Sequence, residues 1–111
     1  MRSKFEEEIY KELCKKYGKL NVQYEADVLH YLSNYYPDFT VTCGKRKFFV
    51  EAKGYFRAKD RSKMRLVKDF NPKVDLRIIF QKDNYYSPTM NYSKWADKNM
   101  FKYIIGKEIV W

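Results

Sequence analysis

Hydrophobic residues recur with helical spacing at the start of the chain. Phe5, Ile9 and Leu13 lie four residues apart within SKFEEEIYKELCKKY, which is the repeat of one helix face. Gly18 follows this segment directly and suits a helix end, because glycine readily adopts the left-handed backbone found there. The pattern therefore predicts a helix over residues 3–17.

The hydrophobic period then changes from four residues to two. Val22, Tyr24, Ala26 and Val28 alternate with polar residues, which predicts a strand because successive side chains of a strand point to opposite faces. Residues 38–53 also alternate on both sides of the turn sequence CGKRK. This second alternating stretch predicts a β-hairpin.

Helical and strand patterns alternate in the rest of the chain. In KDRSKMRLVKDFNP, the spacing of Met64, Val67 and Phe70 predicts an inward helix face, with the helix capped near Asp60 and ending before Pro72. The remaining elements that we expect are a buried strand at residues 74–80, a short helix around YSKWADKN, and an apolar run that ends at Trp111.

The order of these elements, αββ(β)αβα, is typical of a single domain that mixes helices with one sheet. A chain of 111 residues is long enough for one hydrophobic core but not for two. We therefore expect an α/β (mixed α+β) fold in which helices flank a central mixed sheet.

The register of the hairpin follows from its turn. A type II′ turn requires glycine at its first central position, so Gly44 and Lys45 are the expected turn residues. One face of the hairpin is then apolar and consists of Phe39, Val41, Phe48, Val50 and Ala52. The other face carries Asp38, Thr40, Thr42, Lys47, Phe49, Glu51 and Lys53. On this second face, Asp38 lies directly opposite Glu51.

An opposed pair of carboxylates is unfavourable unless a cation lies between them. Directly opposed Cβ atoms are about 4.5–5.5 Å apart, and like charges at that distance are destabilising. A divalent metal between Asp38 and Glu51 reverses the effect, and Lys53 lies on the same face, near enough to orient a water. Alternatively, Asp38 caps a turn and Glu51 pairs with lysines, which leaves the acids purely structural.

Composition narrows the kind of metal that such a site could hold. The chain has one histidine, His30, which we expect to be packed within its tyrosine- and leucine-rich stretch. It also has two distant cysteines, Cys14 and Cys43, which we expect to be free thiols. Zinc sites built from histidine and cysteine therefore lack ligands. Any metal must be held by oxygen atoms, which suits magnesium or manganese.

The excess of positive charge favours an anionic partner. The formal net charge is +9 and the isoelectric point is near 9.5, values that favour nucleic acid or an acidic membrane surface as the partner. The basic residues concentrate in and after the hairpin. Those that we expect to contact DNA phosphates are Lys45, Arg46, Lys47, Arg57, Lys59, Arg61, Lys63, Arg65 and Lys68. The tyrosines of DNYYSPT either stack on exposed bases or pack locally.

Several motifs in a fixed order resemble a known family. They are RSKFEEEI, YPDF, FVEAKGYF, DRSKM, PKVDLRIIF and YSKWADKN followed by FKYIIGKEIVW, and they extend through nearly the whole chain. With PDF at residues 37–39 and EAK at residues 51–53, the chain resembles the PD-(D/E)XK nuclease superfamily, and within it the phage endonuclease I family of T-odd coliphages, which resolves Holliday junctions.

The resemblance implies a catalytic set of Glu6, Asp38, Glu51 and Lys53. Asp38, Glu51 and the backbone carbonyl of Ala52 are expected to hold Mg²⁺, with Mn²⁺ as a substitute, and Lys53 is expected to act at the attacking water. Glu6 is expected to complete the acidic pocket. Its spacing from Ser3 also fits a capping box, and that alternative stays open.

The resemblance also implies a homodimer in which the first helix and a bridging strand exchange between protomers. The expected division is a first helix at residues 1–19, a bridging strand at residues 20–36 and a catalytic core at residues 37–111. Each active site would then receive Glu6 from the other chain. The sequence alone does not distinguish an exchanged strand from one that folds back on its own chain.

The predicted function is metal-dependent, structure-selective cleavage of branched DNA, including four-way junctions. One alternative is a sequence-specific homing, mismatch or nicking endonuclease on the same fold. A second is a basic nucleic-acid-binding protein without catalysis. The sequence has no apolar run long enough to span a bilayer and no signal-peptide pattern, so we expect no membrane partner and a cytoplasmic location in a phage-carrying bacterial host.

Overall fold

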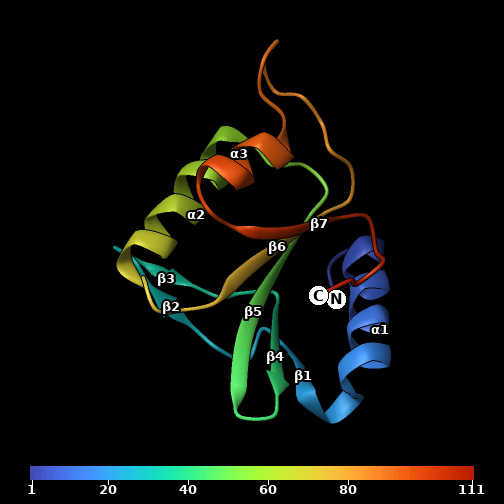
Figure 1. The fold of residues 1–111 in the computed structure, drawn as a ribbon. Helices are drawn as coiled ribbons and strands as arrows, with labels where there is room; N and C mark the ends of the chain where they lie inside the picture. Colours follow the sequence, from blue (N-terminus) through green and yellow to red (C-terminus); the bar gives the residue numbers. More distant parts are fainter.

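A computed structural model describes residues 1–111 and shows a central sheet with helices on both faces (Figure 1). The sheet has five strands in the order β1-β4-β5-β6-β7. Their bounds are β1 Val22–Tyr24, β4 Phe39–Cys43, β5 Arg46–Lys53, β6 Leu76–Phe80 and β7 Lys102–Ile105. The strands β1, β4 and β5 pair antiparallel, whereas β5, β6 and β7 pair parallel. The predicted mixed α and β fold is confirmed.

The helix α1 (Lys4–Tyr17) covers one face of the sheet. Its buried side chains Phe5, Ile9 and Leu13 pack against the apolar face of the hairpin formed by β4 and β5. The helix begins after Ser3 and ends at Gly18, whose positive φ of 93° requires the conformational freedom of glycine. The predicted helix over residues 3–17 is therefore confirmed.

The helices α2 (Ala58–Phe70) and α3 (Tyr92–Lys98) cover the opposite face. Met64 and Val67 of α2 and Trp95 of α3 pack with the sheet residue Phe49 in a second buried cluster. The prediction that Phe70 points inward is wrong, because its side chain is 53% exposed where the helix ends. Successive side chains of β5 thus point alternately into the buried clusters on the two faces of the single sheet, as the predicted faces of the hairpin imply.

The segment between α1 and β4 differs most from the prediction. A short 3₁₀ turn (Lys19–Asn21) precedes β1, which ends at Tyr24 because Glu25 adopts a left-handed backbone with φ 49°. The strands β2 (Leu29–His30) and β3 (Asn34–Tyr35) then form a separate small sheet. The predicted strand over Val22–Val28 is therefore wrong beyond Tyr24, and residues 20–36 do not form one continuous strand.

Two smaller expectations, on the cysteines and on the histidine, also have clear outcomes. Cys14 and Cys43 are free, as predicted. His30 is exposed and its ring contacts Asn34, so it does not pack in the core. No helix of the structure combines the length and the apolar character that crossing a bilayer requires.

Candidate active site

The open end of the β4–β5 hairpin brings two acids together. The observed register pairs Phe39 with Val50, and the chain turns at Gly44, as predicted. Asp38 is one residue outside the paired part of β4, and Glu51 lies on β5 next to Val50. Both carboxylates are buried, with Asp38 4% and Glu51 6% exposed. The acidic pair inferred from the sequence is therefore present.

Burial and a neighbouring charge make Asp38 a weak acid. Loss of hydration and, to a smaller extent, the nearby Glu51 carboxylate together raise the pKa of Asp38 from 3.8 to about 8. The backbone N–H of Ala52 opposes this shift by donating a hydrogen bond of 2.9 Å to Asp38 Oδ2. The Arg2 guanidinium lies 3.6 Å from Asp38 Oδ1 and partly balances its charge.

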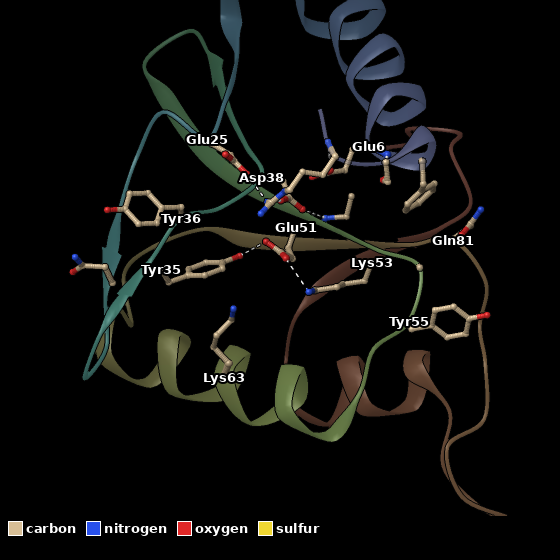
Figure 2. Close-up of a pocket in the computed structure, with 16 residues that line it drawn as sticks. Glu6, Glu25, Tyr35, Tyr36, Asp38, Glu51, Lys53, Tyr55, Lys63 and Gln81 are labelled. Atoms are coloured by element: carbon tan, nitrogen blue, oxygen red, sulfur yellow. Dashed lines mark hydrogen bonds and ion pairs between the residues drawn. The ribbon is translucent and has the colours of Figure 1, made fainter.

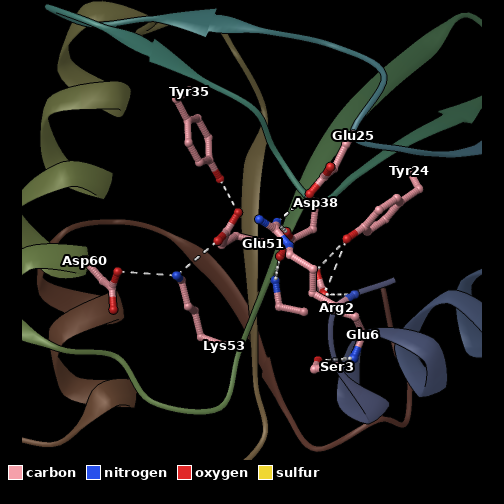
Figure 3. Close-up of polar contacts among 11 residues, drawn as sticks. Arg2, Ser3, Glu6, Tyr24, Glu25, Tyr35, Asp38, Glu51, Lys53 and Asp60 are labelled. Carbon is pink, nitrogen blue, oxygen red and sulfur yellow. Dashed lines mark hydrogen bonds and ion pairs between the residues drawn. The ribbon is translucent and has the colours of Figure 1, made fainter.

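Glu51 is fixed by two donors on opposite sides (Figure 3). The buried hydroxyl of Tyr35 donates a hydrogen bond of 2.5 Å to Glu51 Oε1, and Lys53 Nζ lies 3.2 Å from Glu51 Oε2. Burial raises the pKa of the Tyr35 phenol well above 10, and the Glu51 charge adds to this effect, so Tyr35 stays a donor. The carboxylate of Glu51 therefore has one defined orientation.

Lys53 lies between two acids. Its ammonium is 3.2 Å from Glu51 and 3.3 Å from Asp60, which belongs to the first turn of α2. Burial opposes the charge on Lys53, but Glu51 and Asp60 outweigh this effect and raise its pKa. Lys53 is therefore a fully charged cation that α2 holds beside the acidic pair.

Glu6 reaches the same pocket from α1 and also contributes to the helix N-terminus. Its backbone N–H donates to Ser3 Oγ at 3.0 Å, so Ser3 is the N-cap. Its side chain accepts from the backbone N–H of Arg2 at 3.1 Å, so the reciprocal bond to Ser3 of a capping box is absent. The Glu6 carboxylate also raises the pKa of Asp38, which places the two acids within electrostatic reach.

These groups line one pocket of about 690 Å³ (Figure 2). Figure 2 shows Glu6 above the acidic pair and Tyr35 and Lys63 on the side of α2. All four residues of the predicted catalytic set, Glu6, Asp38, Glu51 and Lys53, line this pocket within a single chain.

The donor set fits a hard divalent cation. Asp38 and Glu51 supply carboxylate oxygens. The Ala52 N–H donates to Asp38, and the carbonyl of a strand residue points to the same side as its own N–H. The Ala52 carbonyl therefore also points to the side of Asp38. No three carboxylate, imidazole or thiol groups converge closely enough to complete a site by themselves. Few protein ligands are typical of Mg²⁺, which usually keeps several waters and binds substrate phosphate.

The structure gathers only part of the predicted basic surface around the pocket. Lys63 lines the pocket, and Arg57 and Lys59 are exposed at the start of α2. Lys45, Arg46 and Lys47 instead surround the hairpin turn, at the opposite end of the hairpin from the acids.

Other members of the predicted basic set have partners within the chain. Arg61 lies 3.6 Å over the Tyr86 ring, and Lys68 donates to the Asn99 carbonyl at 3.0 Å beyond the end of α3. Arg65 is exposed on α2.

Three residues of the site were not predicted from the sequence. Tyr35 and Asp60 orient Glu51 and Lys53, and Arg2 contacts Asp38. Asp60 was recognised only as a helix cap, a role it also has because it accepts from the Arg57 N–H. Nothing in the spacing of the chain separates Tyr35 from its other tyrosines.

Tyr35→Phe should weaken the catalysis expected from the sequence, because Tyr35 orients Glu51, the carboxylate expected to hold the metal. Removing a group that holds a metal ligand in place typically lowers metal affinity or activity by about 10- to 100-fold. We therefore expect a loss of that size in the rate of DNA cleavage, measured as the concentration of Mg²⁺ is varied. Tyr36→Phe is the matched control, because Tyr36 is 54% exposed and makes no bond to Glu51. Equal rates for both variants would contradict the role of Tyr35.

With this geometry established, comparisons with known proteins identify the family. The chain belongs to the phage endonuclease I family, whose model matches residues 1–109. Endonuclease I of Escherichia phage T7 is 31% identical over 110 residues, which cover 92% of this chain and 70% of that protein. Endodeoxyribonuclease 1 of Enterobacteria phage T3 is 31% identical over 68 residues, which cover 59% of this chain and 43% of that protein.

Proposed function

We propose that this protein is a metal-dependent endonuclease that cleaves phosphodiester bonds in branched DNA, including four-way junctions. The observation that carries the proposal is the buried pair of Asp38 and Glu51 with Lys53 at 3.2 Å from Glu51, all at the open end of the β4–β5 hairpin in the centre of the sheet. Two matched relatives are named endonuclease I and endodeoxyribonuclease 1, which supports DNA as the substrate.

The residues of the pocket divide the chemistry between them. Asp38, Glu51 and the Ala52 carbonyl would hold Mg²⁺, or Mn²⁺ in its place, with Glu6 at the margin of the site. The bound ion would supply a Lewis acid and a more acidic water for hydrolysis. Lys53 would orient the attacking water and stabilise the negative charge that develops on the phosphate. Asp60 and Tyr35 would keep Lys53 and Glu51 in position.

Selectivity for branched DNA can be tested directly against a linear duplex of the same sequence. We expect symmetric cuts near the branch point of a labelled four-way junction in Mg²⁺, and little cutting of the duplex. A sequence-specific cut in the duplex would instead assign the protein to the homing, mismatch or nicking endonucleases. Tight binding without any cutting would indicate a non-catalytic DNA-binding protein.

We also propose that the protein acts as a homodimer, since two sites related by a two-fold axis can cut two strands symmetrically. Exposed apolar side chains in the segment between α1 and β4 support this proposal, with Leu20 94% and Leu32 82% exposed. In the single chain, α1 packs on its own sheet, and Glu6 and Asp38 line the same pocket. An exchanged α1 would place the same Glu6 beside the partner's acids.

Mixing two inactive variants distinguishes these arrangements. In a dimer with exchanged α1, one chain with Glu6→Gln and one with Asp38→Asn together form one intact site and one doubly altered site. Nicking of the junction is then restored after the variants are unfolded and refolded together. In a dimer without exchange, both sites of the mixed dimer carry one substitution, and activity stays lost.

A further inference from the structure

A second pocket opens directly beside the candidate active site. It has a volume of about 540 Å³ and shares Gly54, Tyr55 and Gln81 with the first pocket. Its other lining residues are Lys82, Asn84, Tyr85 and Tyr92. Figure 2 shows Tyr55 and Gln81 beyond Lys53, on the opposite side of the acids from Tyr35 and Tyr36. The two pockets therefore form one continuous surface, and we call the second one the tyrosine groove.

Two tyrosines of this groove expose their rings to solvent. Tyr55 is 71% exposed and Tyr85 is 61% exposed, which makes them the two most exposed aromatic side chains of the protein. Tyr92, by contrast, is buried and its hydroxyl accepts a hydrogen bond from the Phe56 N–H. Local packing thus explains Tyr92 but leaves the faces of Tyr55 and Tyr85 available to a ligand.

The charge of the tyrosine groove is suited to a nucleic acid. Lys82 lies in it, Arg57 is 6.0 Å from the centre of the Tyr55 ring, and Lys94 Nζ is 5.7 Å from the centre of the Tyr85 ring. No carboxylate lines the groove, in contrast to the acidic pocket next to it. Aromatic faces bordered by cations are the usual means of binding unpaired bases without sequence preference.

We propose that the tyrosine groove holds an unpaired nucleotide of the DNA substrate, next to the phosphate that is cut. The base stacks on Tyr55 or Tyr85, and the amides of Gln81 and Asn84 are available to its polar edge. Tyr55 follows Lys53 by two residues, so the nucleotide lies beside the scissile bond. This inference rests on the proposed nuclease function and deepens it, because it assigns a subsite for a disrupted base pair.

A fluorescent base tests the subsite in the absence of metal, where the DNA is not cut. The probe is a duplex with one extrahelical 2-aminopurine, compared with a fully paired duplex, each in EDTA. We expect the wild-type protein to quench the extrahelical base and to prefer the bulged duplex. At least one of the two substitutions Tyr55→Ala and Tyr85→Ala should reduce that preference by about 5- to 100-fold, the usual effect of removing a stacking ring.

Matched variants separate stacking from other effects. Tyr55→Phe and Tyr85→Phe retain the ring and should bind as the wild type does. Phe70→Ala removes an aromatic ring that is 53% exposed outside the groove and should have no effect. An unchanged bulge preference in both alanine variants, or no quenching by the wild type, would overturn the subsite.

The same proteins, assayed on a four-way junction in Mg²⁺, distinguish failure of the subsite from failure of the proposed function. Junction cleavage without quenching by the wild type would refute the tyrosine groove alone and leave the nuclease intact. Quenching that depends on the tyrosines, from a protein that cuts no DNA, would retain a base-binding groove but refute the endonuclease.

Discussion

Asp38→Asn should abolish metal-dependent DNA cleavage and, at the same time, stabilise the metal-free protein. Removing a residue that only supports a metal ligand typically lowers metal affinity or activity by about 10- to 100-fold. Removing the proposed ligand Asp38 itself should therefore lower the cleavage rate by at least about 100-fold. The amide can still accept the hydrogen bond from the Ala52 N–H, which is 2.9 Å long in the wild type. The fold around the site should therefore persist.

The gain in stability should depend on pH. Because burial and Glu51 raise the pKa of Asp38 to about 8, the folded protein binds a proton that the unfolded chain releases near pH 3.8. This contribution to stability is complete below about pH 4 and is lost as the pH rises to about 8. Asp38→Asn lacks the titration, so its gain in the free energy of unfolding should grow across that window, towards an upper limit of about 6 kcal/mol, and its melting temperature should rise with it.

Thermal melts in EDTA from pH 4 to pH 9 measure this effect. Asp69→Asn is the matched control, since Asp69 is exposed on α2 and lies outside the pocket. We expect the control to cut DNA normally and to show no gain that increases with pH. An Asp38→Asn protein that cuts DNA at the wild-type rate would show that Asp38 is structural.

Added Mg²⁺ should stabilise the wild type, more strongly at pH 8 than at pH 6, because the ligand must lose its proton.

Lys53→Ala should reduce the rate of cleavage by about 100- to 1,000-fold, the usual cost of removing one group that stabilises charge at the reacting atoms. The affinity for DNA should change little, because the Lys53 side chain is only 19% exposed. The variant also leaves Glu51 buried without its cation, which should lower the free energy of unfolding by about 3 kcal/mol. Cleavage should therefore be measured well below the melting temperature of the variant.

Asp60→Asn separates the chemical role of Lys53 from its structural one. This substitution removes the ion pair at 3.3 Å from Lys53 Nζ but retains the ammonium and its contact with Glu51. We expect the cleavage rate to fall about 10-fold, which is a smaller loss than that of Lys53→Ala, because only the position of the Lys53 ammonium is affected. Losses of equal size in both variants, with equal destabilisation, would indicate that Lys53 acts only through stability.

The hairpin could be predicted from the sequence because two independent signals agreed. The position of Gly44 fixed the turn, and the alternation of apolar residues fixed which side chains share a face. The opposed acids followed from that register alone. The helix α1 was equally clear, because its hydrophobic repeat, its N-cap and Gly18 all indicated the same bounds.

Other features of the structure could not be predicted, because they depend on contacts between distant segments that a local sequence pattern does not indicate. The alternation after Tyr24 resembled a strand, but the left-handed Glu25 ends β1 and lets the chain form a second small sheet. Tyr35 reaches Glu51 only because this small sheet packs near α2. In the same way, a list of lysines and arginines does not show that Arg61 and Lys68 already have partners inside the chain.

Diffraction from crystals grown with Mn²⁺ tests the central claim most directly. Anomalous scattering locates manganese without reference to activity or to relatives. We predict a peak in contact with the carboxylates of Asp38 and Glu51 and with the Ala52 carbonyl, and no such peak in Asp38→Asn crystals. A wild-type structure in which Arg2 and Lys53 keep their ion pairs with these acids, and in which manganese binds elsewhere or not at all, would contradict the account.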